Sequence, residues 1–197
     1  MAILPILQYP DERLKQTSAP IVAIDETMTR LIDDLLETLY NSPGCVGIAS
    51  PQVGALHRMV IIDASRNAKA GDNHGRMILL NPEILSSEGE VMAREGCLSL
   101  PHLTANVKRA QHIKVKAQNE KGEWWEFDTS NFEARVVLHE MDHLDGLLFL
   151  DRVASLKTDV FRRKRYTVPD QPTSQTQDPD SRSQEPAPKT QEPASHS

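Results

Sequence analysis

The stretch Val136-Val137-Leu138-His139-Glu140-Met141-Asp142-His143-Leu144 decides the fold that we expect, because it places an HExxH pentapeptide inside an apolar segment. Histidines four positions apart lie on one face of a helix, so His139 and His143 can reach one cation, with Glu140 beside it as a proton-transfer group. A solvated helix face is the alternative interpretation. Unpaired charged groups in an apolar segment are costly, however, so we predict a metal-binding helix from about Asn131 to about Leu144.

The third protein ligand distinguishes the enzyme classes that use this motif, because a catalytic divalent metal commonly takes three protein ligands and leaves one position for water. The peptidase pattern HExxHxxGxxH fails, since the chain has Gly146 but carries Phe149 where a third histidine would stand. No glutamate follows Glu140 until residue 185. Asp151 and Asp159 are weaker candidates.

Cys97 is the natural third ligand by its context. It lies in Glu95-Gly96-Cys97-Leu98-Ser99, which we expect to be an irregular segment after a strand, with a glycine that permits close backbone approach. Taken alone, a single cysteine is more often an inert buried side chain. The neighbouring residues must therefore decide its role.

The rest of the sequence predicts an α+β fold. Apolar residues recur at helical spacing over residues 25–40, with Asp25 as the N-cap, and a last helix is expected over residues 155–166. Strands are expected at residues 58–63, 77–85, 90–93, 112–118 and 123–128, with a hairpin turn at 119–122. Because helices and strands are segregated, we expect antiparallel sheets packed around a central metal-binding HExxH helix, with an N-terminal and a C-terminal helix.

Composition limits the classes of function and sets the domain boundary. The 197 residues carry a formal net charge of -6, which disfavours a generic nucleic-acid-binding surface. We expect one catalytic domain over residues 1–166 and a disordered tail, rich in Pro, Gln and Ser, over residues 167–197. The N-terminus lacks the features of an export signal and no stretch reaches membrane-spanning length, so we expect a soluble cytoplasmic protein without a membrane partner.

Three segments together resemble the signatures of the peptide deformylase family, which are GxGxAAxQ, EGCxS and HExxH in that order. The first corresponds to Cys45-Val46-Gly47-Ile48-Ala49-Ser50-Pro51-Gln52, the second to Glu95–Ser99 and the third to His139–His143. The likeness extends from about Ile3 to Tyr166, which is nearly all of the chain outside the expected tail.

The resemblance implies a hydrolase that removes the formyl group from the N-terminal formylmethionine of nascent polypeptides. Its metal would be held by Cys97, His139 and His143, with metal-bound hydroxide as nucleophile and Glu140 as general base and acid. The Gln52 amide would help to stabilise the oxyanion. The resemblance also implies that the Leu98 backbone N–H contributes to that stabilisation, and that Fe²⁺ is the physiological metal, with Zn²⁺, Ni²⁺ or Co²⁺ able to replace it.

The substrate in such an enzyme is an N-formylmethionyl peptide that pairs with the backbone like an added strand. The residues implied to contact it, through backbone or an apolar methionine pocket, are Val46, Gly47, Gly96, Phe132 and Val136. Three positions depart from the family pattern: Cys45 replaces the first glycine, Ser50 replaces an alanine, and Thr104 stands where many relatives carry an arginine. Cys45 would strain the loop if its position required positive φ.

Two other functions and one further partner are open at this point. A zinc endopeptidase would use HExxH with an acidic third ligand, and a non-catalytic module with a structural metal would need a fourth ligand such as Cys45. The basic run Arg162-Arg163-Lys164-Arg165 is either a solvated helix face or a contact to ribosomal RNA near the exit tunnel. We expect the protein to be a monomer.

Overall fold

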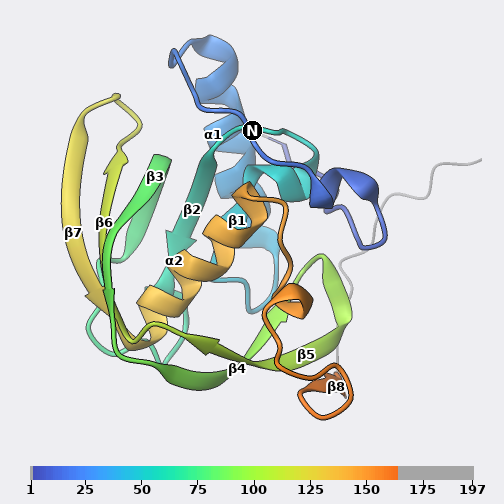
Figure 1. Ribbon diagram of the computed structural model, residues 1–197. Coiled ribbons are helices and arrows are strands. Elements are labelled where there is room, and N and C mark those ends of the chain that lie inside the picture. Colours follow the sequence, from blue (N-terminus) through green and yellow to red (C-terminus); the bar gives the residue numbers. More distant parts are fainter. Residues whose placement is uncertain (1, 164–197) are drawn as a thin grey trace, which may run out of the picture.

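Two antiparallel sheets and two α-helices make up the part of the chain that the computed structural model describes, residues 2–163 (Figure 1). The five-stranded sheet has the order β1-β2-β3-β6-β7, and the three-stranded sheet has the order β4-β5-β8. The strands are β1 (Gly47–Ala49), β2 (Met59–Asp63), β3 (Arg76–Glu88), β4 (Val91–Cys97), β5 (Leu100–Arg109), β6 (His112–Gln118), β7 (Trp124–Ser130) and β8 (Val160–Arg162). The described residues also form four short 3-10 helices: η1 (Glu12–Lys15), η2 (Ser50–Val53), η3 (Ala64–Arg66) and η4 (Phe149–Asp151).

Helix α1 (Glu26–Asn41) confirms the predicted N-terminal helix and its cap. The Met28 backbone N–H donates to the Asp25 side chain over 2.9 Å, which satisfies one of the amide groups that a helix start leaves unpaired. The apolar face of α1 buries Leu35 and Leu39 against a cluster that includes Ile61 of β2. The helix therefore covers one face of the five-stranded sheet.

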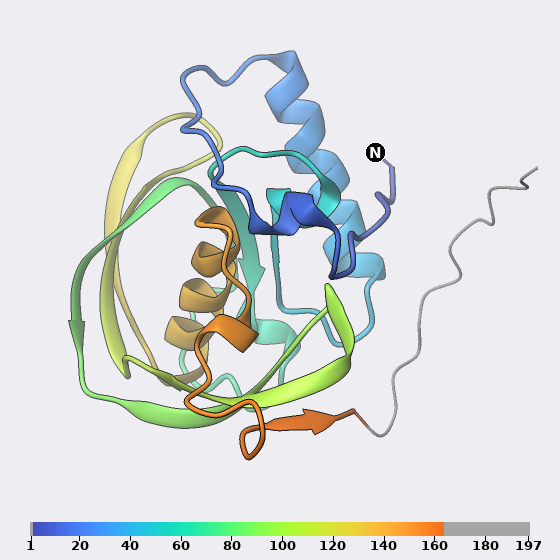
Figure 2. The ribbon, with the colours of Figure 1, turned by 45° about the vertical axis from the view of Figure 1, so that its right-hand side comes forward.

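Helix α2 (Asn131–Leu144) has the predicted bounds and carries the HExxH residues. Val137 and Leu144 are fully buried and pack in one cluster with Val60 and Leu79 of the five-stranded sheet. Figures 1 and 2 show α2 in the space that the two sheets enclose, with β4 and β5 on the side away from β2. This position brings one face of α2 toward the end of β4.

Four predicted strands match β2, β3, β6 and β7 within a few residues. The turn at residues 119–122 is confirmed, since the Gly122 N–H donates to the Asn119 carbonyl over 2.9 Å and Gly122 takes a φ of 81°. Within residues 2–163, no helix combines the length and apolar character that a membrane crossing requires.

The hairpin of β4 and β5 was only partly predicted. The predicted strand at residues 90–93 covers less than half of β4, and β5 was not predicted at all. In β5 the buried side chains alternate through Ala105, Val107 and Arg109, so a charged residue stands where the period-2 pattern requires an apolar one. Partners on other elements stabilise that buried charge, and no local pattern reveals them.

The predicted C-terminal helix over residues 155–166 is wrong. Residues 155–159 form a turn closed by Ser155 and Asp159, whose side-chain carboxylate accepts from the Ser155 N–H and whose own N–H donates to the Ser155 carbonyl. Val160 and Phe161 then extend as β8 along β5, where the aromatic ring of Phe161 lies under Arg94. Residues 164–166 and the predicted tail, residues 167–197, lie outside the described residues.

Candidate active site

One thiol and two imidazoles converge between β4 and α2. Cys97 is the last residue of β4, and His139 and His143 lie one turn apart on α2. Their ligand atoms all lie within 4.8 Å of one another, and the Cys97 sulfur is 3.2 Å from His143 Nε2. Thiolate and imidazole donors suit first-row transition metals. The three predicted ligands therefore form a triad that fits a metal cofactor.

The end of β4 presents Cys97 to the helix because the strand pairing changes there. Gly96 pairs with Thr104, but Cys97 pairs with Leu100, so the register shifts between the two pairs and residues 101–103 of β5 have no pairing partner on β4. The expectation of an irregular segment is thus corrected: Glu95, Gly96 and Cys97 are strand residues, and the irregularity is the register shift between Gly96 and Cys97.

A buried ionic network orients His139. The His139 Nδ1 lies 2.9 Å from Glu95 Oε2, which leaves Nε2 for a metal ion. Two parallel hydrogen bonds from Arg109, each 2.9 Å, hold the same Glu95 carboxylate, and Arg109 also donates to Asp142 over 2.5 Å. Burial would raise the pKa of Glu95, but the hydrogen bonds from Arg109 and His139 lower it to about 2.

Sequence reasoning did not assign a role to either Glu95 or Arg109. Glu95 could have been found, because it stands two residues before Cys97 within the EGCxS segment. Arg109 gives no local signal. It reaches Glu95 only because β4 and β5 form a hairpin, in which the two residues lie on the same buried face.

Glu140 lies in the apolar interior beside the triad. Its side chain is 5% exposed, and Oε2 has no hydrogen-bond partner among the described residues. Burial, followed by the charges of Cys97 and Glu95, raises the pKa of Glu140 to about 7 against the opposing effect of the two histidines. The carboxylate abuts β1, since a Cβ placed on Gly47 would lie 2.6 Å from Glu140 Oε1.

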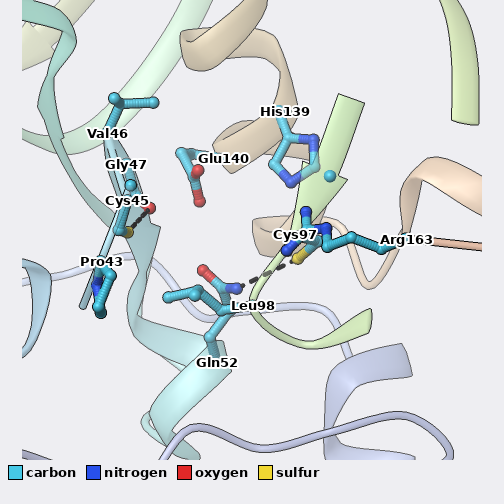
Figure 3. A pocket seen from close by; sticks show the side chains of 12 residues that line it. Pro43, Cys45, Val46, Gly47, Gln52, Cys97, Leu98, His139, Glu140 and Arg163 are labelled. Atoms are coloured by element: carbon cyan, nitrogen blue, oxygen red, sulfur yellow. Dashed lines mark hydrogen bonds between the residues drawn. The ribbon is translucent and has the colours of Figure 1, made fainter. Parts of the chain in front are cut away.

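Gln52 lies at the other side of the triad, on η2. Its side-chain oxygen accepts from the Ala49 N–H (2.9 Å), and its Nε2 lies 3.4 Å from the Cys97 sulfur and 3.2 Å from Ser99 Oγ. Figure 3 shows the Gln52 amide pointing toward Cys97, with Leu98 beside it and Glu140 across the cavity. The bond to Ala49 fixes which end of the amide faces the site.

All the residues predicted to contact substrate line two cavities that share residues. The cavity at the triad, about 100 Å³, is lined by Gly47, Gly96 and Leu98 among others. The neighbouring cavity, about 230 Å³, is lined by Val46, Phe132 and Val136, and also by Gly96, His139 and Glu140. The second cavity thus has an apolar wall and also contacts His139 and Glu140, which line the first cavity.

Cys45 neither joins the triad nor strains the loop. Its sulfur lies 3.0 Å from the Gly47 carbonyl oxygen, to which the thiol donates, and burial raises its pKa to about 12. The positive φ of this loop belongs to Gly44, at 70°, so the cysteine substitutes for glycine without backbone strain. The structural-metal alternative therefore lacks its fourth ligand among residues 2–163.

The acidic third ligand of the endopeptidase alternative is also missing from the described residues. Asp151 pairs with Lys15 over 2.7 Å and accepts from the Leu148 N–H, and Asp159 closes the turn at Ser155. Neither belongs to the group of potential ligands around His139 and His143. The cysteine takes the place that an acid occupies in that alternative.

Arg163 is a site residue that sequence reasoning placed elsewhere. It was expected on a basic helical face with Arg162, but it follows β8 and its side chain lines both cavities. In Figure 3 the side chain of Arg163 reaches toward Cys97. Arg162 is exposed on β8, and Lys164 and Arg165 lie outside the described residues.

Comparison with known proteins agrees with the geometry. Residues 3–159 match the family model of polypeptide deformylase. A peptide deformylase of Thermodesulfovibrio yellowstonii is 43% identical over 164 residues, which are 83% of this chain and 97% of that protein. The crystal structure of a peptide deformylase from Legionella pneumophila superposes with a TM-score of 0.71 and 39% identity, over 79% of this chain and 89% of that one. The crystal structure of a peptide deformylase from Ehrlichia chaffeensis, in complex with actinonin, superposes with a TM-score of 0.74 and 30% identity, over 80% of this chain and 92% of that one.

Proposed function

This chain belongs to the polypeptide deformylase family, and we propose that it removes the formyl group from formylmethionyl peptides through the residues around Cys97, His139 and His143. The observation that carries the assignment of residues is the convergence of one sulfur and two imidazoles beside the buried carboxylate of Glu140, whose Oε2 has no hydrogen-bond partner within residues 2–163. The products are formate and a peptide with a free N-terminal methionine.

The ion in this site is proposed to be Fe²⁺, with Zn²⁺, Ni²⁺ or Co²⁺ able to take its place. The resemblance to the family motifs supports iron, and the sulfur and nitrogen donors are compatible with each of these ions. When bound by Cys97, His139 and His143, a divalent ion polarises a carbonyl and lowers the pKa of water toward neutrality.

Glu140, Gln52 and Leu98 are proposed to carry out the proton transfers and to stabilise the oxyanion. Glu140 takes the proton from the attacking water and later donates it to the departing amine, for which its position between β1 and the triad is suitable. The Gln52 Nε2–H and the Leu98 backbone N–H donate to the developing oxyanion, and both residues line the same cavity. The hydrogen bond to Ala49 supports this role for Gln52, because it keeps Nε2 directed into the site.

The peptide is proposed to bind as a strand between β1 and β4. Both are edge strands of their sheets, and their residues Gly47 and Gly96 line the cavity at the triad. Edge strands offer unpaired backbone groups to an extended peptide. Val46, Phe132 and Val136 then form the wall against which the methionine side chain packs.

We further propose that the protein acts as a monomer in the cytoplasm, where formylated chains leave the ribosome. A contact to ribosomal RNA through Arg162 and its basic neighbours Lys164 and Arg165 stays a proposal, supported by the exposure of Arg162. Co-sedimentation with ribosomes tests it, using a variant with these residues replaced by glutamate. Unchanged binding of that variant would refute the contact.

Formate release from formyl-Met-Ala-Ser tests the function directly. The protein is prepared without oxygen, loaded with Fe²⁺, and assayed beside the same protein loaded with Zn²⁺. We expect stoichiometric formate in both, and faster release with iron. Cleavage at an internal peptide bond without formate would instead indicate an endopeptidase.

A pair of glutamate variants tests the role of Glu140. Glu140→Gln should lower kcat by about 10²- to 10⁴-fold, the usual contribution of a general acid–base group. The matched control is Glu126→Gln on β7, whose exposed carboxylate pairs with Lys114 and lines neither cavity of the site, so this change should not affect kcat. Equal metal content in the two variants excludes loss of the ion as the cause.

A further inference from the structure

The fully buried carboxylate of Glu133 ties two other segments to the start of α2. Its Oε1 accepts a hydrogen bond from the His74 backbone N–H over 2.8 Å, and its Oε2 accepts one from Thr129 Oγ1 on β7, also over 2.8 Å. The same Oε2 lies 2.6 Å from Nδ1 of the His74 ring. Glu133 thus binds the loop before β3, residues 67–75, through both the backbone and the ring of one residue. No step of the proposed hydrolysis uses this carboxylate.

The first turn of α2 depends on Glu133 because the helix starts without a side-chain cap. Among the described residues, the N-cap residue Ser130 makes no capping hydrogen bond through its side chain, and Asn131 enters the helix with a φ of 53°. Helix starts of this kind leave backbone N–H groups unpaired and tend to fray. Glu133 places a negative charge in the first turn, where the helix dipole favours one, and fastens that turn to its neighbours.

The same turn carries the apolar wall that is proposed to hold the methionine side chain. Phe132 directly precedes Glu133, Val136 lies one turn further along the helix, and both line the cavity of about 230 Å³. Asn67, which belongs to the same loop as His74, also lines this cavity. A shift of the loop or of the first turn would therefore change the shape of the methionine wall.

The ring of His74 is itself held against the core. It meets the ring of Phe127 edge-on, with the two centroids 5.3 Å apart and an angle of 63° between the planes. Phe127 belongs to the buried cluster that contains Val136 and Val137. The contact keeps the His74 ring in one orientation, with Nδ1 toward Glu133. A side chain that is fixed by packing in this way can support a neighbouring site.

We propose that His74 is a positioning residue that acts through Glu133 to hold Phe132 and Val136 where they select a methionine side chain. The inference rests on the proposed function, because it names what keeps the pocket of that same site selective. An apolar pocket discriminates among side chains by size, since each methylene that fills it adds to transition-state binding. When the first turn of α2 fluctuates, the pocket loses part of that discrimination.

Two peptides measure the state of the wall. We would compare kcat/KM for formate release from formyl-Met-Ala-Ser and formyl-Ala-Ala-Ser, which differ only in the side chain that meets the wall. His74→Ala should lower the Met/Ala ratio by about 2- to 10-fold, the usual contribution of one hydrogen bond, mainly through a higher KM for the Met peptide. His74→Asn keeps a side-chain N–H donor and should recover part of the ratio. The control His112→Ala, at an exposed position of β6 opposite Ser130, should keep the full ratio.

Hydrogen exchange tests the same idea without an activity assay. The amides of residues 135–137 donate to carbonyls at the start of α2, so they should exchange faster in His74→Ala than in the unaltered protein. The amides of residues 141–144, at the other end of the helix, should keep their protection. Equal exchange of residues 135–137 in the two proteins would show that His74 does not hold the first turn.

An unchanged Met/Ala ratio in His74→Ala would overturn the inference even if the urea midpoint fell, because His74 would then stabilise the fold without positioning the wall. An equal fall of the ratio in His112→Ala would overturn it as well. If the unaltered protein released no formate from either peptide, the proposed function would fail together with the inference.

Discussion

Gly47 shows how closely a single residue limits the site. A Cβ at this position would lie 2.6 Å from Glu140 Oε1 and 2.9 Å from Val136 Cγ1. Gly47→Ala should therefore displace the Glu140 carboxylate, and a misplacement of about 1 Å can lower kcat by about 10²-fold. Overpacking of the buried wall should also lower the free energy of unfolding by about 1–3 kcal/mol. Formate release and urea unfolding measure the two effects.

Gly71→Ala is the control for Gly47→Ala. Nothing lies within 4 Å of a Cβ at Gly71, but its φ of 62° strains an alanine there. This variant should lose some stability and keep its kcat. Normal kcat in Gly47→Ala would show that the Glu140 carboxylate does not need its observed position.

Residues that carry local patterns could be predicted from the sequence. His139 and His143 follow from helical spacing, and Cys97 from the failure of the downstream ligand patterns. Arg109 and Arg163 could not be predicted, because Arg109 lies on β5 and Arg163 directly follows β8, and the place of both strands depends on tertiary pairing. Their long side chains act far from their own positions in the sequence.

Arg109 joins three elements, and its replacement should destabilise all of them together. Its guanidinium binds Glu95 of β4 and Asp142 of α2, with all three side chains at most 7% exposed. Arg109→Met keeps most of the volume but leaves Glu95 with His139 alone and Asp142 with the partly exposed Arg152 alone. Removing one partner from a buried ion pair typically costs about 3–5 kcal/mol. The same change should weaken metal binding by about 10- to 100-fold, since Glu95 orients His139. Urea unfolding and a metal competition titration give the two values.

The matched variant is Arg58→Met, which breaks an ion pair to Asp145 at the surface. Asp145 is 50% exposed, and pairs of this kind contribute about 0–1 kcal/mol. Metal affinity should not change in this control. Similar losses of stability in the two variants would mean that the buried network contributes no more than a surface pair.

At the scale of elements, periodicity predicted the helices better than the strands. The apolar stripe of α1 and the HExxH segment of α2 span several turns, so their bounds could be found to within a residue. The hairpin of β4 and β5 buries charged Glu95 and Arg109, which hides its alternation. The strand after Ser155 could not be predicted, because its pairing with β5 is non-local and leaves no pattern in the segment itself.

The family match and strand β8 together give a prediction about the end of the chain. The family match covers residues 3–159, and β8 ends at Arg162. Deleting residues 167–197, the predicted tail, should leave the urea midpoint and kcat/KM unchanged. A chain that stops at Asp159 lacks β8, so it should lose stability because the edge of β5 from Leu103 to Ala105 is uncovered. A lower midpoint after the first deletion would show that the tail contributes to the fold.

The metal site joins the two sheets of the molecule. Cys97 ends β4 in the three-stranded sheet, whereas His139 and His143 lie on α2, which packs against the five-stranded sheet. An ion held by these three residues would therefore connect the two sheets, although Cys97 and the two histidines are far apart in the sequence. A ligand that binds only the folded state at 100 times its Kd stabilises it by about 2.7 kcal/mol.

Removal of the ion should accordingly lower the protection of the three-stranded sheet against hydrogen exchange more than that of the five-stranded sheet. After treatment with a chelator, we expect faster amide hydrogen exchange in β4 and β5, because Cys97 then loses its link to α2. Strands β2 and β3 should keep their protection, because they pack in the core around Val60 and Leu79. Cys97→Ser should exchange like the chelated protein whether or not metal is added. Exchange that rises equally in both sheets, or a response to metal that persists in Cys97→Ser, would show that the ion does not connect the layers through this sulfur.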